Sequence, residues 1–183
     1  MKHLTTLVLV LAFGACGMQA RDLHVQMTFS GTQTSLAPQV SLAPGAGPTG
    51  EAILAGNGSL GPFTDHEVGA STAAPTSFGC AGPNSATFKT VTAAGIFRFQ
   101  DGSLLTYKTT AGSQCIDFTK GIGTVNFTYG ITGGTGYFKN ATGTLQVTAS
   151  GYPVLFDATG RQLVLGVITG GMVTGTIVLP NEE

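Results

Sequence analysis

The densest group of ionisable side chains in this 183-residue chain is the tripeptide Asp65-His66-Glu67. In an extended strand Asp65 and Glu67 would share a face, where two carboxylates can act as oxygen ligands for a cation. Three consecutive residues cannot complete a metal shell, and the preceding G-P-F-T bend favours a solvated loop here. No HExxH, CxxC or EF-hand string occurs elsewhere in the sequence, which therefore predicts no metal site and no cofactor.

Asp117 is the one acid that we nominate for general acid or base chemistry. If it faced the interior of a β-barrel, burial would raise its pKa and suit it to proton transfer at neutral pH. The alternative, a carboxylate satisfied within a turn or at a rim, is the more common case. No serine lies in a G-x-S-x-G elbow, so the chain contains no complete hydrolytic motif.

Cys80 and Cys115 are the only cysteines beyond the N-terminal segment. In an exported chain such a pair predicts a disulfide, because the compartment is oxidising. A catalytic thiol is disfavoured, since no histidine lies near either cysteine in the sequence.

Residues 1–20 have the organisation of a secretory signal peptide. Lys2 precedes an apolar run at residues 7–13, and small residues follow. The run is too short to cross a hydrocarbon core of about 30 Å, so we expect no membrane span. We expect residues 21–183 to form a single domain that is secreted or periplasmic. The string F-G-A-C, which ends at Cys16, resembles a bacterial lipobox, so a lipid anchor in the cell envelope through Cys16 is the alternative.

Composition narrows the classes of partner. Charged residues make up 9% of the chain and the formal net charge is -1, so no basic patch is available to bind phosphates. A nucleic acid is therefore not an expected partner. Tryptophan is absent, which also disfavours the stacking platforms common in lectins. The sequence does not indicate an oligomeric state.

Strand patterns dominate after the signal peptide. The segment HVQMTFSG, which starts at His24, and the segment TVNFTYGIT, which starts at Thr124, both alternate apolar with polar residues. No window has the spacing of an amphipathic helix free of glycine and clustered β-branched residues. Residues 36–50 and 67–86 are rich in proline, glycine or small residues and are predicted as loops. Residues 163–179 are predicted as a closing hairpin or a long strand with a glycine bulge.

A hairpin is predicted within residues 94–110, because Asp101-Gly102 lies between two β-rich arms. A two-residue turn would pair Phe99 with Leu104 and Phe97 with Thr106. The core face would then hold Phe97, Phe99 and Leu104, whereas Leu105 and Tyr107 would lie outside.

Many strands, tight turns and almost no helix predict an all-β fold. We expect a closed antiparallel β-barrel of about eight strands, with a β-sandwich as the alternative. Closure is favoured because the strands carry few charged residues or prolines to protect an open edge.

The stretch at residues 131–145, ITGGTGYFKNATGTL, is predicted to turn between neighbouring strands and to fold its aromatic pair onto the core. Here the chain resembles the allene oxide cyclase and dirigent β-barrels, which carry GGTG, an aromatic residue and A-x-G. A second string, in which a glycine precedes L-G-x-F-T, is similar to one in bacterial exported relatives of that barrel. The matching residues are Gly133, Gly134, Thr135, Gly136, Phe138, Ala141 and Gly143, with Gly56, Leu60, Gly61, Phe63 and Thr64.

The resemblance implies a barrel whose interior holds a small apolar ligand, and plant members of the family cyclise a fatty-acid epoxide or guide phenoxy-radical coupling. No catalytic residue of those enzymes matches a position here. We therefore favour a non-enzymatic binding or envelope-associated module for a small apolar ligand. The alternative is an isomerase or cyclase acting on a hydrophobic substrate inside the barrel, with Asp117 as the acid. In either case the ligand would contact Phe97, Phe99, Phe127 and Tyr129.

Overall fold

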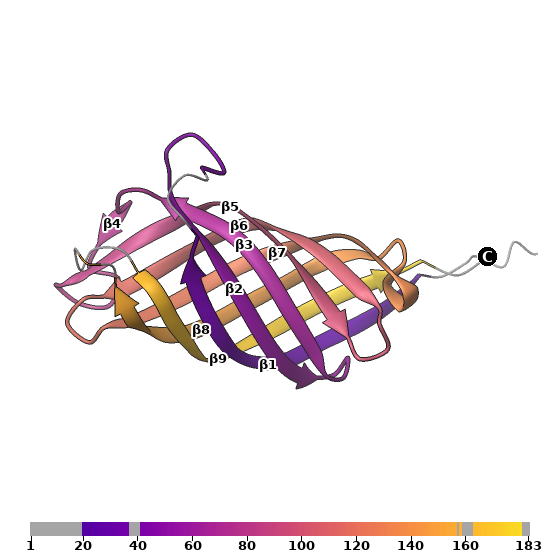
Figure 1. Ribbon diagram of the computed structural model, residues 1–183. Coiled ribbons are helices and arrows are strands. Elements are labelled where there is room, and N and C mark those ends of the chain that lie inside the picture. The colour runs from indigo at the N-terminus through magenta and orange to yellow at the C-terminus, as the bar shows by residue number, and fades with distance from the viewer. Residues whose placement is uncertain (1–19, 37–40, 157, 159–162, 181–183) are drawn as a thin grey trace, which may run out of the picture.

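The computed structural model describes residues 20–36, 41–156, 158 and 163–180, and most of them lie in strands (Figure 1). The signal peptide and Cys16 fall outside these residues, so the expectations about them remain predictions. Within the described residues the single helical element is the short 3-10 turn η1, Gly136–Phe138. The strands are β1 Arg21–Ser35, β2 Ala46–Gly58, β3 Phe63–Thr72, β4 Ser77–Phe78, β5 Ser85–Phe99, β6 Leu104–Asp117, β7 Ile122–Thr135, β8 Thr142–Phe156 and β9 Leu163–Leu179.

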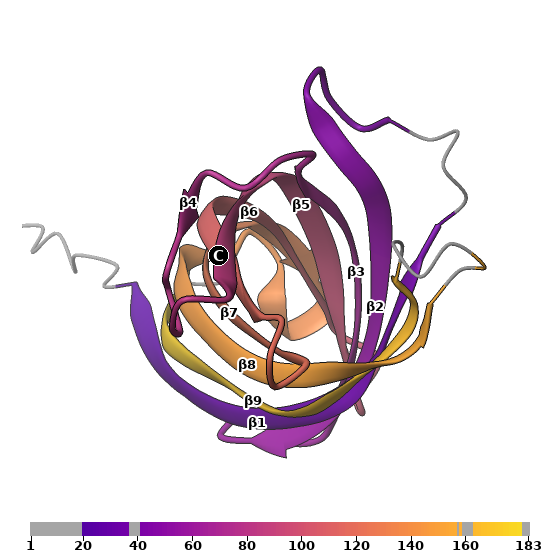
Figure 2. The ribbon, with the colours of Figure 1, turned by 90° about the vertical axis from the view of Figure 1, so that its left-hand side faces the viewer.

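Eight of these strands form a closed antiparallel barrel. Their order is β3-β2-β1-β9-β8-β7-β6-β5, and β3 pairs with β5 to close the ring. The view along the barrel in Figure 2 shows this ring. The remaining strand, the short β4, lies outside this ring and pairs only with the start of β5. The predicted closed barrel is confirmed, and the sandwich alternative is wrong because no open edge separates two sheets.

The core fills the barrel interior and follows the period-2 alternation of the strands. In β1, Val25, Met27 and Phe29 are buried, whereas the residues between them are exposed. The same pattern places Tyr129 inside the barrel from β7. Burial of these alternating apolar side chains is the main force that fixes the strand register. The other large interior side chains are Leu54, Phe63, Phe97, Phe99, Leu105, Tyr107, Phe138, Leu145, Val147, Val173, Ile177 and Leu179.

The glycine-rich stretch at residues 131–145 forms a corner between β7 and β8. Gly136 opens η1 with a φ of +56°, a conformation that favours glycine. The following Phe138 is buried, and its ring centroid lies 4.7 Å from that of Phe99. Tyr137, in contrast, remains exposed. Of the aromatic pair, therefore, only Phe138 folds onto the core.

The hairpin between β5 and β6 differs from the prediction by one residue. Phe97 pairs with Leu105 and Arg98 with Leu104, around a three-residue loop at 100–102. The loop is closed by the Phe99 N–H donating to the Ser103 carbonyl, with Gly102 at a φ of +83°. Phe97 and Phe99 face the core as predicted. The predicted outward position of Leu105 and Tyr107 is wrong, because the longer loop turns both side chains inward.

Two further predictions are corrected in part. The sequence predicts a loop at residues 67–86, but they contain the end of β3, the strand β4 and the start of β5. Residues 163–179 form one long strand, β9, and its register against β1 and β8 shifts near Gly170. The glycine-bulge alternative is therefore confirmed and the closing hairpin is wrong. No helix in the described part of the chain is long and apolar enough to cross a membrane.

Candidate functional site

Strand β3 carries two acidic side chains into the barrel. Asp65 and Glu67 follow the buried Phe63 at intervals of two residues, so all three share the inner face. His66 points to the outer wall, where it contacts the carboxylate of Glu51. The expected solvated loop is therefore wrong: Asp65 is only 2% exposed. The strand pairs on both sides, with β2 and β5, and this pairing holds the acids inside.

Two tyrosines reach the same region from β6 and β7. The rings of Tyr107 and Tyr129 stack with their centroids 4.0 Å apart and their planes at 16°. Tyr107 crosses closely over β5 at Gly95, where a Cβ atom would lie 2.3 Å from the tyrosine hydroxyl oxygen. A side chain at position 95 would displace this ring, so glycine is needed for the close approach.

The four polar side chains form one hydrogen-bonded group, here called the acid–phenol cluster: Asp65, Glu67, Tyr107 and Tyr129. Tyr107 Oη lies 2.9 Å from Asp65 Oδ2 and 3.0 Å from Glu67 Oε2. The hydroxyl of Tyr129 donates to the same Glu67 oxygen. Both phenols therefore converge on the two carboxyl groups within the barrel.

Burial suppresses charge in the acid–phenol cluster. Desolvation, followed by the nearby Glu67, raises the pKa of Asp65 to about 8. Desolvation also raises the pKa of Glu67, although the hydroxyls of Tyr129 and Tyr107 oppose this shift. The pKa values of both tyrosines lie well above the ordinary value, with desolvation as the first cause and the Glu67 charge as the second. At neutral pH Asp65 is therefore mainly protonated and can both donate and accept a hydrogen bond.

Aromatic side chains surround the cluster. The Phe97 ring centroid lies 5.0 Å from that of Tyr107, and the Phe127 ring centroid lies 6.2 Å from that of Tyr129. Phe99 packs further along the same interior, against Phe63 and Phe138. The structure thus brings together all four residues that the sequence nominated as ligand contacts, Phe97, Phe99, Phe127 and Tyr129. The sequence pattern shows that Asp65 and Glu67 would share a strand face, but we expected a solvated loop there and an outward Tyr107, so the cluster itself was not predicted.

Strands β3, β5 and β6 contain buried threonine hydroxyl oxygens without a hydrogen-bond partner. Among the described residues, Oγ1 of Thr72, Thr90 and Thr109 is buried and makes no hydrogen bond. Thr109 pairs across the sheet with Tyr129. A Cβ atom on Gly112 would lie 2.5 Å from the Phe127 ring and 2.9 Å from Thr90 Oγ1, so these three residues meet at one point. Unsatisfied buried hydroxyls are uncommon and are typical of sites that take water or a ligand.

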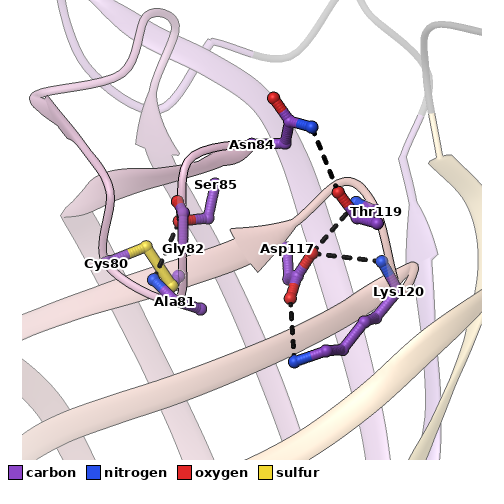
Figure 3. Close-up of polar contacts among 9 residues, drawn as sticks. Cys80, Ala81, Gly82, Asn84, Ser85, Asp117, Thr119 and Lys120 are labelled. Carbon is purple, nitrogen blue, oxygen red and sulfur yellow. Dashed lines mark hydrogen bonds and ion pairs between the residues drawn. A yellow bond between two sulfur atoms is a disulfide. The ribbon is translucent and has the colours of Figure 1, made fainter.

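Asp117 lies at the end of β6, in the turn that leads to β7 (Figure 3). Its Oδ1 atom accepts hydrogen bonds from the backbone N–H groups of Thr119, at 2.9 Å, and Lys120, at 3.1 Å. The side chain of Lys120 lies 3.4 Å from Oδ2. These contacts, the Lys120 N–H first, lower the pKa of Asp117. The structure therefore places Asp117 in a turn that favours its charged form, and its nomination as a catalytic acid remains an untested prediction.

The predicted disulfide is confirmed. Cys80, in the loop after β4, is bonded to Cys115 on β6, with the two Cα atoms 6.1 Å apart (Figure 3). The same loop is held by Ser85, whose Oγ atom accepts the Ala81 N–H and donates to the Gly82 carbonyl. The loop that carries β4 is therefore fixed to the end of the barrel by covalent and polar contacts.

Two surface depressions lie on the outer wall. One, of about 570 Å³, is open to solvent and includes Thr87, Lys89, Ser113 and Thr128. These residues are mostly polar and, as with Thr128 beside Tyr129, alternate with inward-facing ones. In the described part of the chain no group of three His, Cys, Asp or Glu side chains is placed to hold a metal ion. The acid–phenol cluster therefore remains the strongest candidate site.

Comparison with known proteins finds similarity to solved structures alone. No protein-family profile matches the chain, and no curated protein does. Two similar solved structures are the pterocarpan synthase dirigent proteins GePTS1 and PsPTS1. The first is 14% identical with a TM-score of 0.45, and the match covers 91% of this chain and 90% of that one. The second is 15% identical with a TM-score of 0.44, and the match covers 89% of this chain and 97% of that one. At this level of similarity neither structure says anything about the ligand or activity of this chain.

Proposed function

We propose that this chain is an exported barrel that binds a small, mainly apolar molecule and that the acid–phenol cluster holds the polar group of that molecule. The observation that carries the proposal is the convergence of Asp65, Glu67, Tyr107 and Tyr129 inside an aromatic interior. Small-molecule sites are typically apolar cavities with a few converging polar groups, and this arrangement has that composition.

The charge of the cluster favours a neutral polar group on the ligand. Because the pKa of Asp65 is raised to about 8, this carboxyl group is mainly uncharged at pH 7 and offers a hydroxyl donor beside the two phenols. A ligand hydroxyl or carbonyl would match these groups, whereas an anion would meet two carboxyls. Of the four side chains in the cluster, Glu67 has the largest solvent-exposed fraction. We therefore expect an entering ligand to contact Glu67 before the other three.

The wall beside Glu67 supports the same proposal. The unpaired hydroxyls of Thr90 and Thr109 would gain hydrogen bonds from a polar ligand group or from its bound water. Phe127 and Thr90 pack directly against Gly112, so a larger residue at this position would displace them and change the wall of the site. The apolar body of the ligand would then pack against Phe127 and Tyr129.

A second candidate function, acid–base isomerisation or cyclisation of a hydrophobic substrate, is favoured by one observation. The raised pKa of Asp65 lies close to neutral pH, where a side chain transfers protons most effectively. In this alternative the acid would be Asp65, because the contacts around Asp117 hold it in its charged form. The binding function ranks first because it needs only the converging polar groups and the aromatic interior.

The test is native mass spectrometry of the protein purified from its own host, followed by organic extraction of any retained molecule. We expect a retained small molecule in the natural protein and at least a tenfold weaker affinity for it in the variant Glu67→Gln. Glu51→Gln, on the outer wall, is the matched control and should bind normally. A protein that retains nothing, or a Glu67→Gln variant that binds equally well, would contradict the proposal.

The same preparation separates the two candidate functions. The extracted molecule is incubated with fresh protein and then analysed by chromatography and mass spectrometry. A binding protein returns it unchanged, whereas an isomerase or cyclase converts it to a product of equal mass and different retention time. Loss of that conversion in Asp65→Asn, with binding retained, would assign the acid role to Asp65.

Export is part of the proposal and has its own test. Intact-mass measurement of the protein recovered outside the cytoplasm should give a mature start at Arg21 or Met18 with no acyl group. Lipid anchoring instead predicts incorporation of labelled fatty acid that Cys16→Ala abolishes. A full-length chain retained in the cytoplasm would contradict both routes of export.

A further inference from the structure

The antiparallel topology divides the connections of the barrel between its two ends. One end, here called the apolar end, receives the junctions β1–β2, β3–β5, β6–β7 and β8–β9, and the short strand β4 lies there. It is on the left in Figure 1 and faces the viewer in Figure 2. The opposite end carries the other junctions and the start of β1 at Arg21.

Exposed large apolar side chains gather at the apolar end. Phe78, in β4, is 76% exposed, and Phe118, in the β6–β7 turn, is 60% exposed. Ile122 follows that turn and is also exposed. The remaining members, all exposed, come from the end of β8, the start of β9 and the β1–β2 junction: Tyr152, Val154, Leu155, Phe156, Val164 and Leu42. A gathering of exposed apolar side chains at one end of a molecule is typical of an interaction site.

The apolar end is also almost free of charge. Among residues 36, 41–45, 73–84, 118–121, 152–156, 158 and 163–165, the single charged residue is Lys120. Lys120 pairs with Asp117 at 3.4 Å, so even this charge is balanced (Figure 3). Asp157 and Arg161, in the β8–β9 connection, lie outside the described residues. The opposite end, in contrast, carries Arg21, Asp22, Asp101 and Lys139.

The extension of β8 and β9 indicates what kind of partner covers this end. The pairing of β8 with β7 ends at Gly151, and the pairing of β9 with β1 ends at Leu165. Beyond these points Val154, Leu155 and Phe156 are consecutive and all exposed. The β8–β9 register shifts here, and Leu155 and Phe156 pair with Leu165 and Leu163. Because adjacent strand residues such as Leu155 and Phe156 point to opposite faces, the two-stranded ribbon of residues 152–156 and 163–165 is apolar on more than one side. A protein partner would cover one face of the ribbon and leave the other exposed. A fluid apolar medium would surround the ribbon and cover both faces.

The positions of the apolar residues around the barrel lead to the same conclusion. They project from separate junctions around the rim, as for contact with a broad surface, and do not line a groove on one wall. Aromatic and aliphatic side chains at such tips partition into the interfacial region of a bilayer. Insertion must stay shallow, because the open edges of a two-stranded ribbon would leave unpaired backbone groups in the hydrocarbon core.

We propose that the apolar end is a membrane-docking surface, which inserts the side chains of Phe78, Phe118 and the exposed residues 154–156 into the interfacial layer of a lipid bilayer. The disulfide Cys80–Cys115 holds the Phe78 loop in place at the rim. Attachment is hydrophobic and independent of lipid charge, because the described part of this end has no unbalanced charge. The proposal does not depend on the ligand or the chemistry of the acid–phenol cluster.

The chain contains no tryptophan, so a single introduced tryptophan reports insertion without background. The variants are Phe118→Trp at the apolar end and Tyr137→Trp at the opposite end, where Tyr137 is 46% exposed. Oxidised, non-acylated protein is mixed with phosphatidylcholine vesicles. We expect a blue shift and quenching by brominated lipid for Phe118→Trp and neither effect for Tyr137→Trp. Equal responses from both variants, or none from Phe118→Trp, would overturn the proposal.

Vesicle flotation of tryptophan-free variants measures the contribution of the apolar residues. Removing two exposed phenylalanine side chains in Phe78→Ser/Phe118→Ser should weaken partitioning by tenfold or more, as expected from the apolar area lost. The matched control is Ile53→Ser/Ile96→Ser, two exposed isoleucines on the outer wall. It should float as the natural protein does, and thermal melting of both variants confirms folding. Equal losses in the two double variants would contradict a docking surface at this end.

Two further outcomes would contradict the proposal. If the blue shift of Phe118→Trp increases with protein concentration in the absence of lipid, the apolar end binds a second copy of the chain and the proposal fails. If flotation needs anionic lipid and is lost at high salt, attachment is electrostatic and the hydrophobic insertion proposed here is wrong.

Discussion

Oη of Tyr107 lies 2.9 Å from Oδ2 of Asp65, although 42 positions separate the two residues. The same oxygen lies 3.0 Å from Glu67 Oε2. A phenol has one proton, so Tyr107 can donate to only one of these carboxyl groups at a time. The other contact needs a proton on the carboxyl group itself. The arrangement therefore favours a protonated acid, in agreement with the raised pKa of Asp65.

The stability of the barrel should fall as the pH rises from 5 to 8. An acid whose pKa is higher in the folded than in the unfolded chain stabilises the fold fully below its unfolded pKa, near 4. This stabilisation is lost as the pH rises through the folded pKa, which for Asp65 is about 8. The loss should be on the order of a few kcal/mol. Denaturant unfolding at several pH values measures it.

The variant Asp65→Asn is the control for this pH dependence. It keeps the shape of the side chain but cannot ionise, so the part of the pH dependence that comes from Asp65 is lost, whereas the part that comes from the raised pKa of Glu67 remains. The lowered pKa values of Asp101 and Asp117 affect stability only below about pH 4, outside this window. An equal slope in the natural protein and in Asp65→Asn would show that Asp65 does not titrate as argued.

The hydroxyl of Tyr107 should hold down the pKa of Asp65. Its hydrogen bond opposes the upward shift that burial causes, so Tyr107→Phe should raise the pKa of Asp65 further. Loss of the bond should also destabilise the fold by about 1–3 kcal/mol, because a buried carboxyl loses its partner. Carbon-13 NMR of the aspartate carboxyl groups measures the titration. Tyr152→Phe, which changes an exposed tyrosine, should leave it unaltered, and a lower pKa in Tyr107→Phe would refute the argument.

The fold was more predictable than the site because each strand shows a local alternation of apolar and polar residues. Strands β1 and β7 have strict apolar–polar periods, and Cys80 and Cys115 are the only pair that can form a disulfide in the domain. The site depends on contacts between distant strands, which a local pattern does not contain. Phe63, Asp65 and Glu67 do have the period of an inward face, but two acids are seldom buried in a barrel.

The hairpin register shows a second limit of prediction. A two-residue and a three-residue loop both use Asp101-Gly102, but they place opposite faces of β6 in the core. The side chain of Asp101 selects the longer loop, because its Oδ1 and Oδ2 accept hydrogen bonds from the backbone N–H and the hydroxyl of Ser103. Tyr107 therefore enters the interior as a result of a contact that periodicity cannot reveal.

The disulfide should contribute substantially to stability. Cys80 and Cys115 are 35 positions apart, and closing a loop of this length stabilises the folded state by about 4 kcal/mol in the chain-entropy model. Chemical denaturation of Cys80→Ser/Cys115→Ser against the oxidised protein measures the difference. We expect the double variant to keep the barrel, because the cluster and core are independent of the bond. An unchanged unfolding free energy would show that the native bond is offset by strain or by residual structure in the unfolded chain.

Gly95 should be far less replaceable than Gly170, although both lie within strands. An alanine Cβ at position 95 would lie 2.3 Å from the hydroxyl oxygen and 2.5 Å from Cζ of Tyr107. The ring cannot retreat, because it stacks on Tyr129 on one side and packs against Phe97 on another. Gly95→Ala should therefore destabilise the barrel by about 1–3 kcal/mol, the usual cost of overpacking a core.

Gly170→Ala is the matched control, since no atom lies within 4 Å of the position that its methyl group would take and its φ is not left-handed. Its unfolding free energy should stay within about 0.5 kcal/mol of the natural value. Gly95→Ala should also move the titration of Asp65, because displacing Tyr107 removes the hydrogen bond that lowers the pKa of that acid. Thermal melting and carboxyl NMR of the two alanine variants measure both effects. If Gly95→Ala behaves like Gly170→Ala in both measurements, the close packing of Tyr107 over β5 does not determine the geometry of the acid–phenol cluster.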